Sequence, residues 1–211
     1  MMSNIELIFP EIFISLSIMF LLILGVFKKN SSKIIHNISL LVLLIAAVIT
    51  FNETIGISRT ILFNESIVVD YLSSFMKIIT LISAFVVLLI SSNYLKTFKI
   101  FKIEYPILIL SSVLGMMIMI SSNDLIVFYM GLELQSLALY VLATFNRDQL
   151  KSSEAGLKYF VLSALSSGLL LYGCSLIYGF TGSTNFNFIS TQFNTSEYAL
   201  TFGIVFVLVG L

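Results

Sequence analysis

The sequence predicts an all-α protein that crosses a membrane about seven times, and three observations support this prediction. Of its 211 residues, 58% are hydrophobic and only 10% are charged. The mean hydropathy is +1.06, whereas a soluble domain carries roughly 25% charged residues and needs them to face water. Apolar runs recur along the whole chain, and most have the ~20 residues that an α-helix needs to cross the hydrocarbon core.

Seven apolar runs account for most of the chain, at residues 10–27, 34–51, 71–94, 105–122, 125–145, 154–180 and 198–211. Pro10 and Pro106 stand at the start of a run, where a missing backbone N–H costs no helical hydrogen bond. Asp70, Asp124 and Ser153 precede runs and are predicted to cap them. The last run stays apolar to its final residue, so we expect residues 1–211 to be a piece of a longer protein.

The basic residues lie mainly in alternate loops, which predicts an orientation. Eight of the eleven Lys and Arg residues follow the first, third and fifth runs: Lys28, Lys29, Lys33, Lys96, Lys99, Lys102, Arg147 and Lys151. The other loops hold only Arg59, and two lysines lie inside runs. The positive-inside rule places the eight in the cytoplasm, or in the matrix of a mitochondrion. The N-terminus is then expected on the periplasmic or intermembrane side.

Several kinds of chemistry are excluded by composition. Cys174 is the only cysteine, so the chain has no internal disulfide, no CxxC metal site and no cysteine-held iron–sulfur cluster. His36 is the only histidine and is expected at the interface. The zero formal net charge gives no indication of nucleic-acid binding. What chemistry remains is carried by charges inside the apolar runs.

Glu133 is the most central of these charges. It lies ten residues after Asn123, near the start of the fifth run, which places it about 15 Å into the membrane at a rise of 1.5 Å per residue. A charge at this depth costs roughly 2.5–3.5 kcal/mol on insertion scales and usually faces the bundle interior. Tyr129, Ser136 and Tyr140 share its helical face. We predict a proton-carrying carboxyl, and the alternative is a carboxyl held for packing.

Two lysines and two further carboxylates, Glu11 and Glu154, also fall inside runs. Lys158 follows Glu154 by four residues, which is the spacing of an ordinary helix ion pair, so a functional role and a packing role are both open. Lys77 shares a face with Asp70 and either extends to the outer interface or points at neighbouring helices. Glu11 lies in the first turn of its run, where the helix dipole favours an anion.

Three segments carry a family resemblance. Residues 123–143, NDLIVFYMGLELQSLALYVLA, resemble the fifth helix of the N subunit of bacterial NADH:quinone oxidoreductase, respiratory complex I (subunit 2 in mitochondria). Residues 153–173, SEAGLKYFVLSALSSGLLLYG, followed by SLIYGFTG at 175–182, resemble the next helix, and VDYLSSFMK at 69–77 is similar to the third. The likeness extends from PEIF at 10–13 to the final residue, and the GLELQSL segment at 131–137 is its most specific part.

The resemblance implies a membrane-arm subunit that couples electron transfer from NADH to quinone with proton translocation. It implies an antiporter-like helical bundle with inverted repeats, in which 1–104 holds three leading helices and 105–211 holds the first part of the proton-translocating repeat. Glu133 corresponds to the family's proton-channel glutamate, Lys158 to a polar residue of the next helix, and Lys77 to a position of uncertain role. The lysine partner of Glu133 is expected a few residues beyond Leu211.

The same resemblance implies partners and cofactors. The partners would be other membrane-arm subunits in the bacterial inner membrane or the mitochondrial inner membrane. No redox cofactor is expected in this chain, because NADH, FMN, iron–sulfur clusters and quinone would be used in other subunits. Two alternatives remain open: a cation/proton antiporter or hydrogenase-linked membrane subunit of the same fold, and a passive membrane scaffold.

Overall fold

The computed structural model describes residues 6–27, 32–54, 59–98, 100–192 and 197–211. Six helices in this part of the chain are long and apolar enough to cross a membrane. They are α2 (Phe9–Phe27), α3 (Ser32–Thr54), α4 (Tyr71–Thr97), α5 (Glu104–Ser121), α6 (Leu125–Ala143) and α7 (Leu150–Thr181). The last predicted run forms the shorter apolar helix α9 (Glu197–Gly210), which follows the short α8 (Phe186–Gln192). The predicted all-α multi-pass architecture is confirmed.

Helix starts were predicted with unequal success. Asp70 caps α4, where its carboxylate accepts a hydrogen bond from Ser73 N at 2.7 Å. Asp124 caps α6 by accepting from Ile126 N at 2.8 Å. The cap predicted at Ser153 is wrong, because α7 begins three residues earlier at Leu150. Ser153 lies within its first turns, with its hydroxyl donating to the carbonyl of Arg147.

A small antiparallel hairpin was not predicted. It consists of β1 (Thr60–Leu62) and β2 (Ile67–Val69), with Thr60 opposite Val69 and Leu62 opposite Ile67. Three non-glycine residues with positive φ form its tip: Phe63, Asn64 and Glu65, with φ of 51°, 52° and 68°. Neighbouring segments hold this strained tip in place. The carbonyl of Glu65 accepts hydrogen bonds from the side-chain amides of Asn123, at 2.8 Å, and Asn185, at 3.0 Å.

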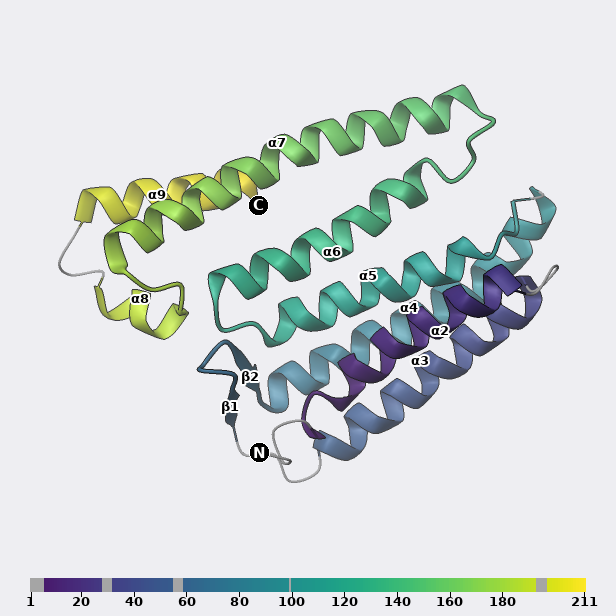
Figure 1. The fold of residues 1–211 in the computed structure, drawn as a ribbon, viewed down its shortest axis with the longest axis horizontal. Coiled ribbons are helices and arrows are strands. Elements are labelled where there is room, and N and C mark those ends of the chain that lie inside the picture. The colour runs from purple at the N-terminus through teal and green to yellow at the C-terminus, as the bar shows by residue number, and fades with distance from the viewer. Residues whose placement is uncertain (1–5, 28–31, 55–58, 99, 193–196) are drawn as a thin grey trace.

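The helices run back and forth between two ends of the molecule (Figure 1). We call one the hairpin end, since β1–β2, the α5–α6 turn and the α7–α8 turn meet there. We call the other the basic end, where the described cations are Lys33, Lys96, Lys102, Arg147 and Lys151. This alternation agrees with the pattern of basic loops in the sequence.

Two groups of helices make up the bundle. The larger core lies among α2, α3, α4 and α5 and includes Ile14, Leu43, Leu81, Leu110 and Met117. In this group α2 packs on α3 and α5, and α4 packs on the same two helices, so α2 and α4 face each other diagonally across the centre. A smaller core joins α6, α7, α8 and α9, and Figure 1 shows α6 between the two groups. The division at residue 105 stays a prediction, since α5 packs on both sides.

The outer surface of the helices is apolar. Large hydrophobic side chains are exposed on α2, α3, α4, α6 and α7, among them Val26, Ile45, Leu72, Met130 and Leu165. A soluble monomer rarely exposes contiguous apolar surface on this scale, so lipid or neighbouring subunits must cover it. The first half of α7 is particularly exposed: within 150–162 only Gly156 is buried. This helix is rich in small residues, which allow close helix approach, yet the described helices cover only part of it.

Candidate functional site

The start of α6 is fixed by several contacts of Asp124. One carboxylate oxygen caps the helix, and the other accepts a hydrogen bond from the Thr184 hydroxyl at 2.5 Å. The backbone N–H of Leu125 donates to the carbonyl of Thr184 at 2.9 Å. These bonds tie the beginning of α6 to the turn that follows α7. The depth of every residue along α6, Glu133 included, is therefore set relative to α7.

Two glycines bring α5 and α6 into backbone contact beside Glu133. A Cβ atom on Gly131 would lie 2.8 Å from Met119 N, and one on Gly115 would lie 2.6 Å from Gln135 N. Both neighbours are backbone atoms, so no side-chain adjustment would relieve the clash. The side chains that follow Gly131 on α6 are thereby held at fixed positions against α5 and α7. Glu133 is the charged member of this set.

Glu133 is half-buried in the middle of α6, and its Oε1 atom has no hydrogen-bond partner among the described residues. It lines a cavity of about 360 Å³ between α5, α6, α7 and the end of α9. The polar side chains around this cavity are Gln135, Ser136, Tyr140, Tyr159, Ser163, Ser166 and Ser167. A polar cavity of this size has room for water. The expected clustering of Glu133 with Ser136 and Tyr140 is confirmed, whereas Tyr129 packs against the smaller core.

Aromatic contacts between α6 and α7 lie beside the cavity. The ring of Tyr140 lies edge-on to Tyr159, with centroids 4.9 Å apart, and edge-on to Phe160 at 5.7 Å. These contacts join α6 to the exposed half of α7. Tyr159, the residue after Lys158, thus lies at the cavity that Glu133 lines, although Lys158 itself does not line it.

Lys158 forms the ordinary helix pair that its spacing suggested. Its Nζ atom lies 2.6 Å from Oε1 of Glu154, and the two side chains are 68% and 53% exposed. In the described part of the chain the structure does not bring Lys158 and Glu133 to one site. A role for Lys158 in proton transfer stays a prediction.

Lys77 does not extend to the interface, so that interpretation is wrong. Its Nζ atom lies 2.5 Å from Oε1 of Glu11, and the two side chains are 4% and 9% exposed. Since α2 and α4 lie diagonally opposite, this ion pair crosses the centre of the four-helix group. Asp70 is engaged in its cap. Glu11 was interpreted only as an anion at a helix start, but it is also the buried partner of Lys77.

Glu11 is therefore the residue of this pair that sequence reasoning missed. Glu11 and Lys77 both lie within two turns of the hairpin-end start of their helices, so they share a depth in the membrane. The matching depths and opposite charges of the two residues could have indicated this ion pair from the sequence. What the sequence could not show is that α2 and α4 face each other.

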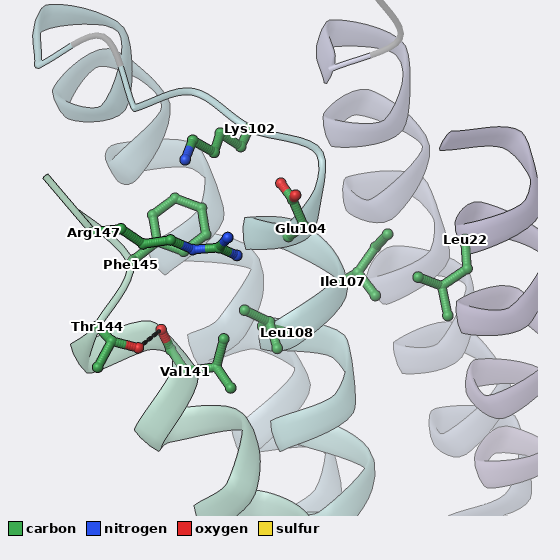
Figure 2. A pocket seen from close by; sticks show the side chains of 9 residues that line it. All are labelled: Leu22, Lys102, Glu104, Ile107, Leu108, Val141, Thr144, Phe145 and Arg147. Atoms are coloured by element: carbon green, nitrogen blue, oxygen red, sulfur yellow. Dashed lines mark hydrogen bonds between the residues drawn. The ribbon is translucent and has the colours of Figure 1, made fainter. Parts of the chain in front are cut away.

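A second pocket, of about 250 Å³, lies at the basic end and is drawn in Figure 2. Three charged side chains gather around it, Lys102, Glu104 and Arg147, above an apolar lining that includes Leu22 and Ile107. Lys102 Nζ lies 6.0 Å from the centroid of the Phe145 ring. None of the three site residues predicted from the sequence, Glu133, Lys158 and Lys77, lines this pocket. In residues 6–27, 32–54, 59–98, 100–192 and 197–211, no group of His, Cys, Asp and Glu is arranged to hold a metal ion.

Comparison with known proteins gives the class of this fold. Residues 122–211 match the family described as "NADH:quinone oxidoreductase/Mrp antiporter, TM". Two solved structures have the same fold. Respiratory complex I from Thermus thermophilus matches with a TM-score of 0.79 and 24% sequence identity, and the match covers 95% of this chain and 42% of that one. The Mrp complex from Dietzia matches with a TM-score of 0.76 and 21% sequence identity, and the match covers 98% of this chain and 40% of that one. The chain is thus a multi-pass membrane protein with an antiporter-like fold.

Sequence relatives define the resemblance more narrowly. The chain is 70% identical over 210 residues to NADH-quinone oxidoreductase subunit N of Pelagibacter ubique. The alignment covers 100% of this chain and 44% of the relative. It is 49% identical over 211 residues to subunit N of Maricaulis maris, covering 99% and 44%. The resemblance to the N subunit is confirmed. The chain spans less than half the length of these curated relatives.

Proposed function

We propose that this chain is part of a membrane-arm subunit that couples electron transfer from NADH to quinone with proton translocation. The 70% identity to a protein named NADH-quinone oxidoreductase subunit N supports this assignment. In this proposal the redox reaction takes place in other subunits, which carry FMN and iron–sulfur clusters and bind NADH and quinone. The chain's own task is to move protons, and its partners are the other membrane-arm subunits.

One observation carries the proton-moving role: a carboxylate oxygen of Glu133 is buried, with no hydrogen-bond partner in the described part of the chain, beside a polar cavity at the middle of its helix. A buried charge without a compensating hydrogen bond is costly, so the carboxyl gains from taking up a proton or from contacting water. In the proposed mechanism, water in the cavity gives a proton to Glu133 and later removes it. Hydroxyls such as Ser136 and Tyr159 lie around the same space and extend the hydrogen-bonded route.

A cation must favour the ionised state of Glu133 if the proton is to leave. We propose that this cation is a lysine in the part of the full-length protein beyond Leu211, which would approach Glu133 and stabilise its negative charge. Lys158 would act as a further stage of the same route. Its exposed face on α7 is available for helices of the longer protein, and packing there would remove the Lys158–Glu154 pair from lipid.

The proposed location is the bacterial inner membrane or the mitochondrial inner membrane, with the N-terminus on the periplasmic or intermembrane side. The support is electrostatic, since cations gather at the basic end and the positive-inside rule places such an end in the cytoplasm or matrix. In this orientation the hairpin end faces outward.

The assignment is tested by purifying the native full-length protein from its membrane in mild detergent. We expect it to elute within a large assembly that oxidises NADH and reduces quinone. Capture of the full-length chain through an epitope tag should deplete this activity from solution together with the chain. Elution as a free chain, without NADH-oxidising partners, would contradict the assignment to the respiratory complex.

A second candidate function is cation/proton antiport. The matched family description includes Mrp antiporters, and the fold likeness to the Mrp complex has a TM-score of 0.76. The discriminating measurement uses the purified full-length protein alone in proteoliposomes. Proton exchange that depends on a sodium gradient would favour the antiporter. Proton movement only in the presence of NADH and quinone, within the assembly, would favour the first function.

A further inference from the structure

The buried pair of Glu11 and Lys77 is only partly satisfied. Oε1 of Glu11 contacts Lys77, but Oε2 is buried and has no hydrogen-bond partner among the described residues. A carboxylate presents about four lone-pair sites, so a single contact leaves most of its accepting capacity unused. The Glu11 side chain is only 9% exposed, so bulk water does not supply the missing bonds.

A third charged group, Glu53, is electrostatically coupled to the pair. It lies at the hairpin end of α3, is half-buried, and interacts electrostatically with both Glu11 and Lys77. If all three groups are ionised, two carboxylates face one ammonium, and the cluster carries a net charge of −1. A net charge inside an apolar bundle is unfavourable. One additional proton would make the cluster neutral.

Other charged groups on the packed elements do not supply this compensation. Asp70, on α4, is occupied as a helix cap. Lys33 of α3 and Glu104 of α5 lie at the basic end, and so does His36. On the hairpin side, the side chains of Arg59 and Glu65 are exposed to the exterior.

A cavity gives Glu11 a connection toward the hairpin end. It has a volume of about 380 Å³, lies between α2 and α5, and has Glu11, Ser15 and Ser121 as its polar lining. Ile67 of β2 also lines it, which places that side of the cavity beside the hairpin. Its other lining side chains are apolar, so water in it would bind at these three oxygen-bearing side chains. Three oxygen-bearing side chains beside an ammonium are a poor site for a metal cation, which requires about six oxygen ligands, but they suffice for a proton and water.

We propose that Glu11, Glu53 and Lys77 form a second protonatable site, which holds one excess proton and exchanges it through water in this cavity with the aqueous phase at the hairpin end. Loading transfers a proton from hydronium to one carboxylate, leaves a water molecule, and changes the charge of the cluster from −1 to zero. Release is the reverse step. No other bond is made or broken. The inference does not depend on the role of Glu133.

The test is infrared difference spectroscopy of the full-length protein in its native assembly, titrated with pH. We expect a carboxylic-acid C=O band from this cluster at neutral pH, and we expect it to be lost in Glu53→Gln, where the remaining Glu11–Lys77 pair is already neutral. Glu11→Gln should lose the same band, because Glu53 and Lys77 then balance each other. Glu65→Gln, at the exposed hairpin tip, is the control and should keep it.

The contrary outcomes are equally specific. An identical carboxylic-acid spectrum in the wild type and in Glu53→Gln, which leaves the Glu11–Lys77 pair intact, would mean that the pair is a structural ion pair only. Loss of the wild-type band when sodium replaces choline at constant pH would mean that the site binds a metal cation, which would overturn the proton assignment. Normal pumping by Glu133→Gln would overturn the proposed role of Glu133 without removing the band that depends on Glu11 and Glu53, so the two proposals are separable.

Discussion

Two ion pairs in this protein have nearly the same geometry and very different surroundings. Lys77 and Glu11 are 2.5 Å apart with side chains 4% and 9% exposed, whereas Lys158 and Glu154 are 2.6 Å apart with side chains 68% and 53% exposed. Burial decides how much each pair matters. Removing one partner of a buried pair leaves an uncompensated charge, while an exposed pair is worth little.

Lys77→Met is therefore expected to destabilise the full-length protein by about 3–5 kcal/mol, because Glu11 loses its partner. The matched control, Lys158→Met, should change the free energy of unfolding by less than about 1 kcal/mol. Thermal unfolding in one detergent measures both. The double variant Glu11→Gln with Lys77→Met should recover part of the loss. Equal effects of the two single lysine variants would contradict the burial argument.

At the residue scale, the sequence located charges but did not show what they face. The depth of Glu133 and its polar neighbours Ser136 and Tyr140 followed from helical spacing alone, and the structure places all three around one cavity. The partner of Lys77 did not follow, because spacing within one helix carries no information about which helix lies opposite. Glu53 was missed for the same reason.

At the scale of elements, backbone contact between α5 and α6 holds the Glu133 region together. Gly115 and Gly131 make this contact, since a Cβ on either would lie within 3 Å of backbone atoms of the other helix. Small residues allow such close approach in membranes, where packing rather than the hydrophobic effect drives helix association. Any side chain at these positions must push the helices apart.

Gly131→Val is expected to destabilise the protein by at least ~1–3 kcal/mol, the usual cost of overpacking, and to disturb the Glu133 cavity. Gly168 on α7 is the control, because a Cβ there meets no atom within 4 Å. Gly168→Ala should be neutral or stabilising by up to about 1 kcal/mol, because alanine favours helix. The midpoint of thermal unfolding reports both changes. A Gly131→Val protein as stable as the wild type would refute the close contact.

The helices were predictable because a span is specified by the length and polarity of its own residues. All six long helices fall on predicted runs. The boundary of α7 was not predicted, since Leu150 and Lys151 extend the helix beyond the apolar part into a polar segment. The β1–β2 hairpin was not predicted either, because its three-residue strands are short and the bonds from Asn123 and Asn185 that support its tip are distant in sequence.

At the scale of the whole molecule, the apolar exterior and the separation of the two ends define how the protein sits in a membrane. The basic end carries the described loop lysines and Arg147, and the hairpin end carries Glu65 at its tip. The proposed orientation places the first in the cytoplasm or matrix and the second outside. Both Arg147 and Glu65 are exposed, so they are suitable positions for labelling.

Single cysteines at Arg147 and Glu65, in a full-length protein whose own cysteines have been replaced, are expected to react from opposite sides. An impermeant thiol reagent added to right-side-out vesicles should label Glu65→Cys, and it should label Arg147→Cys only after the membrane is opened. Inside-out vesicles should reverse the pattern. Labelling of both positions from the same side would contradict this topology, in which three helices, α4, α5 and α6, separate them.

The most direct test of the central claim is NADH-driven proton pumping by the assembled complex that carries Glu133→Gln, compared with Glu133→Asp. We expect Glu133→Gln to assemble normally and to pump at least ~10-fold more slowly, because an amide cannot carry the proton and such transfers typically contribute ~10²-fold or more. Glu133→Asp should retain part of the activity, and Glu65→Gln all of it. Full pumping and quinone reduction by Glu133→Gln, with only a gain in stability, would instead identify Glu133 as a packing residue in a passive scaffold.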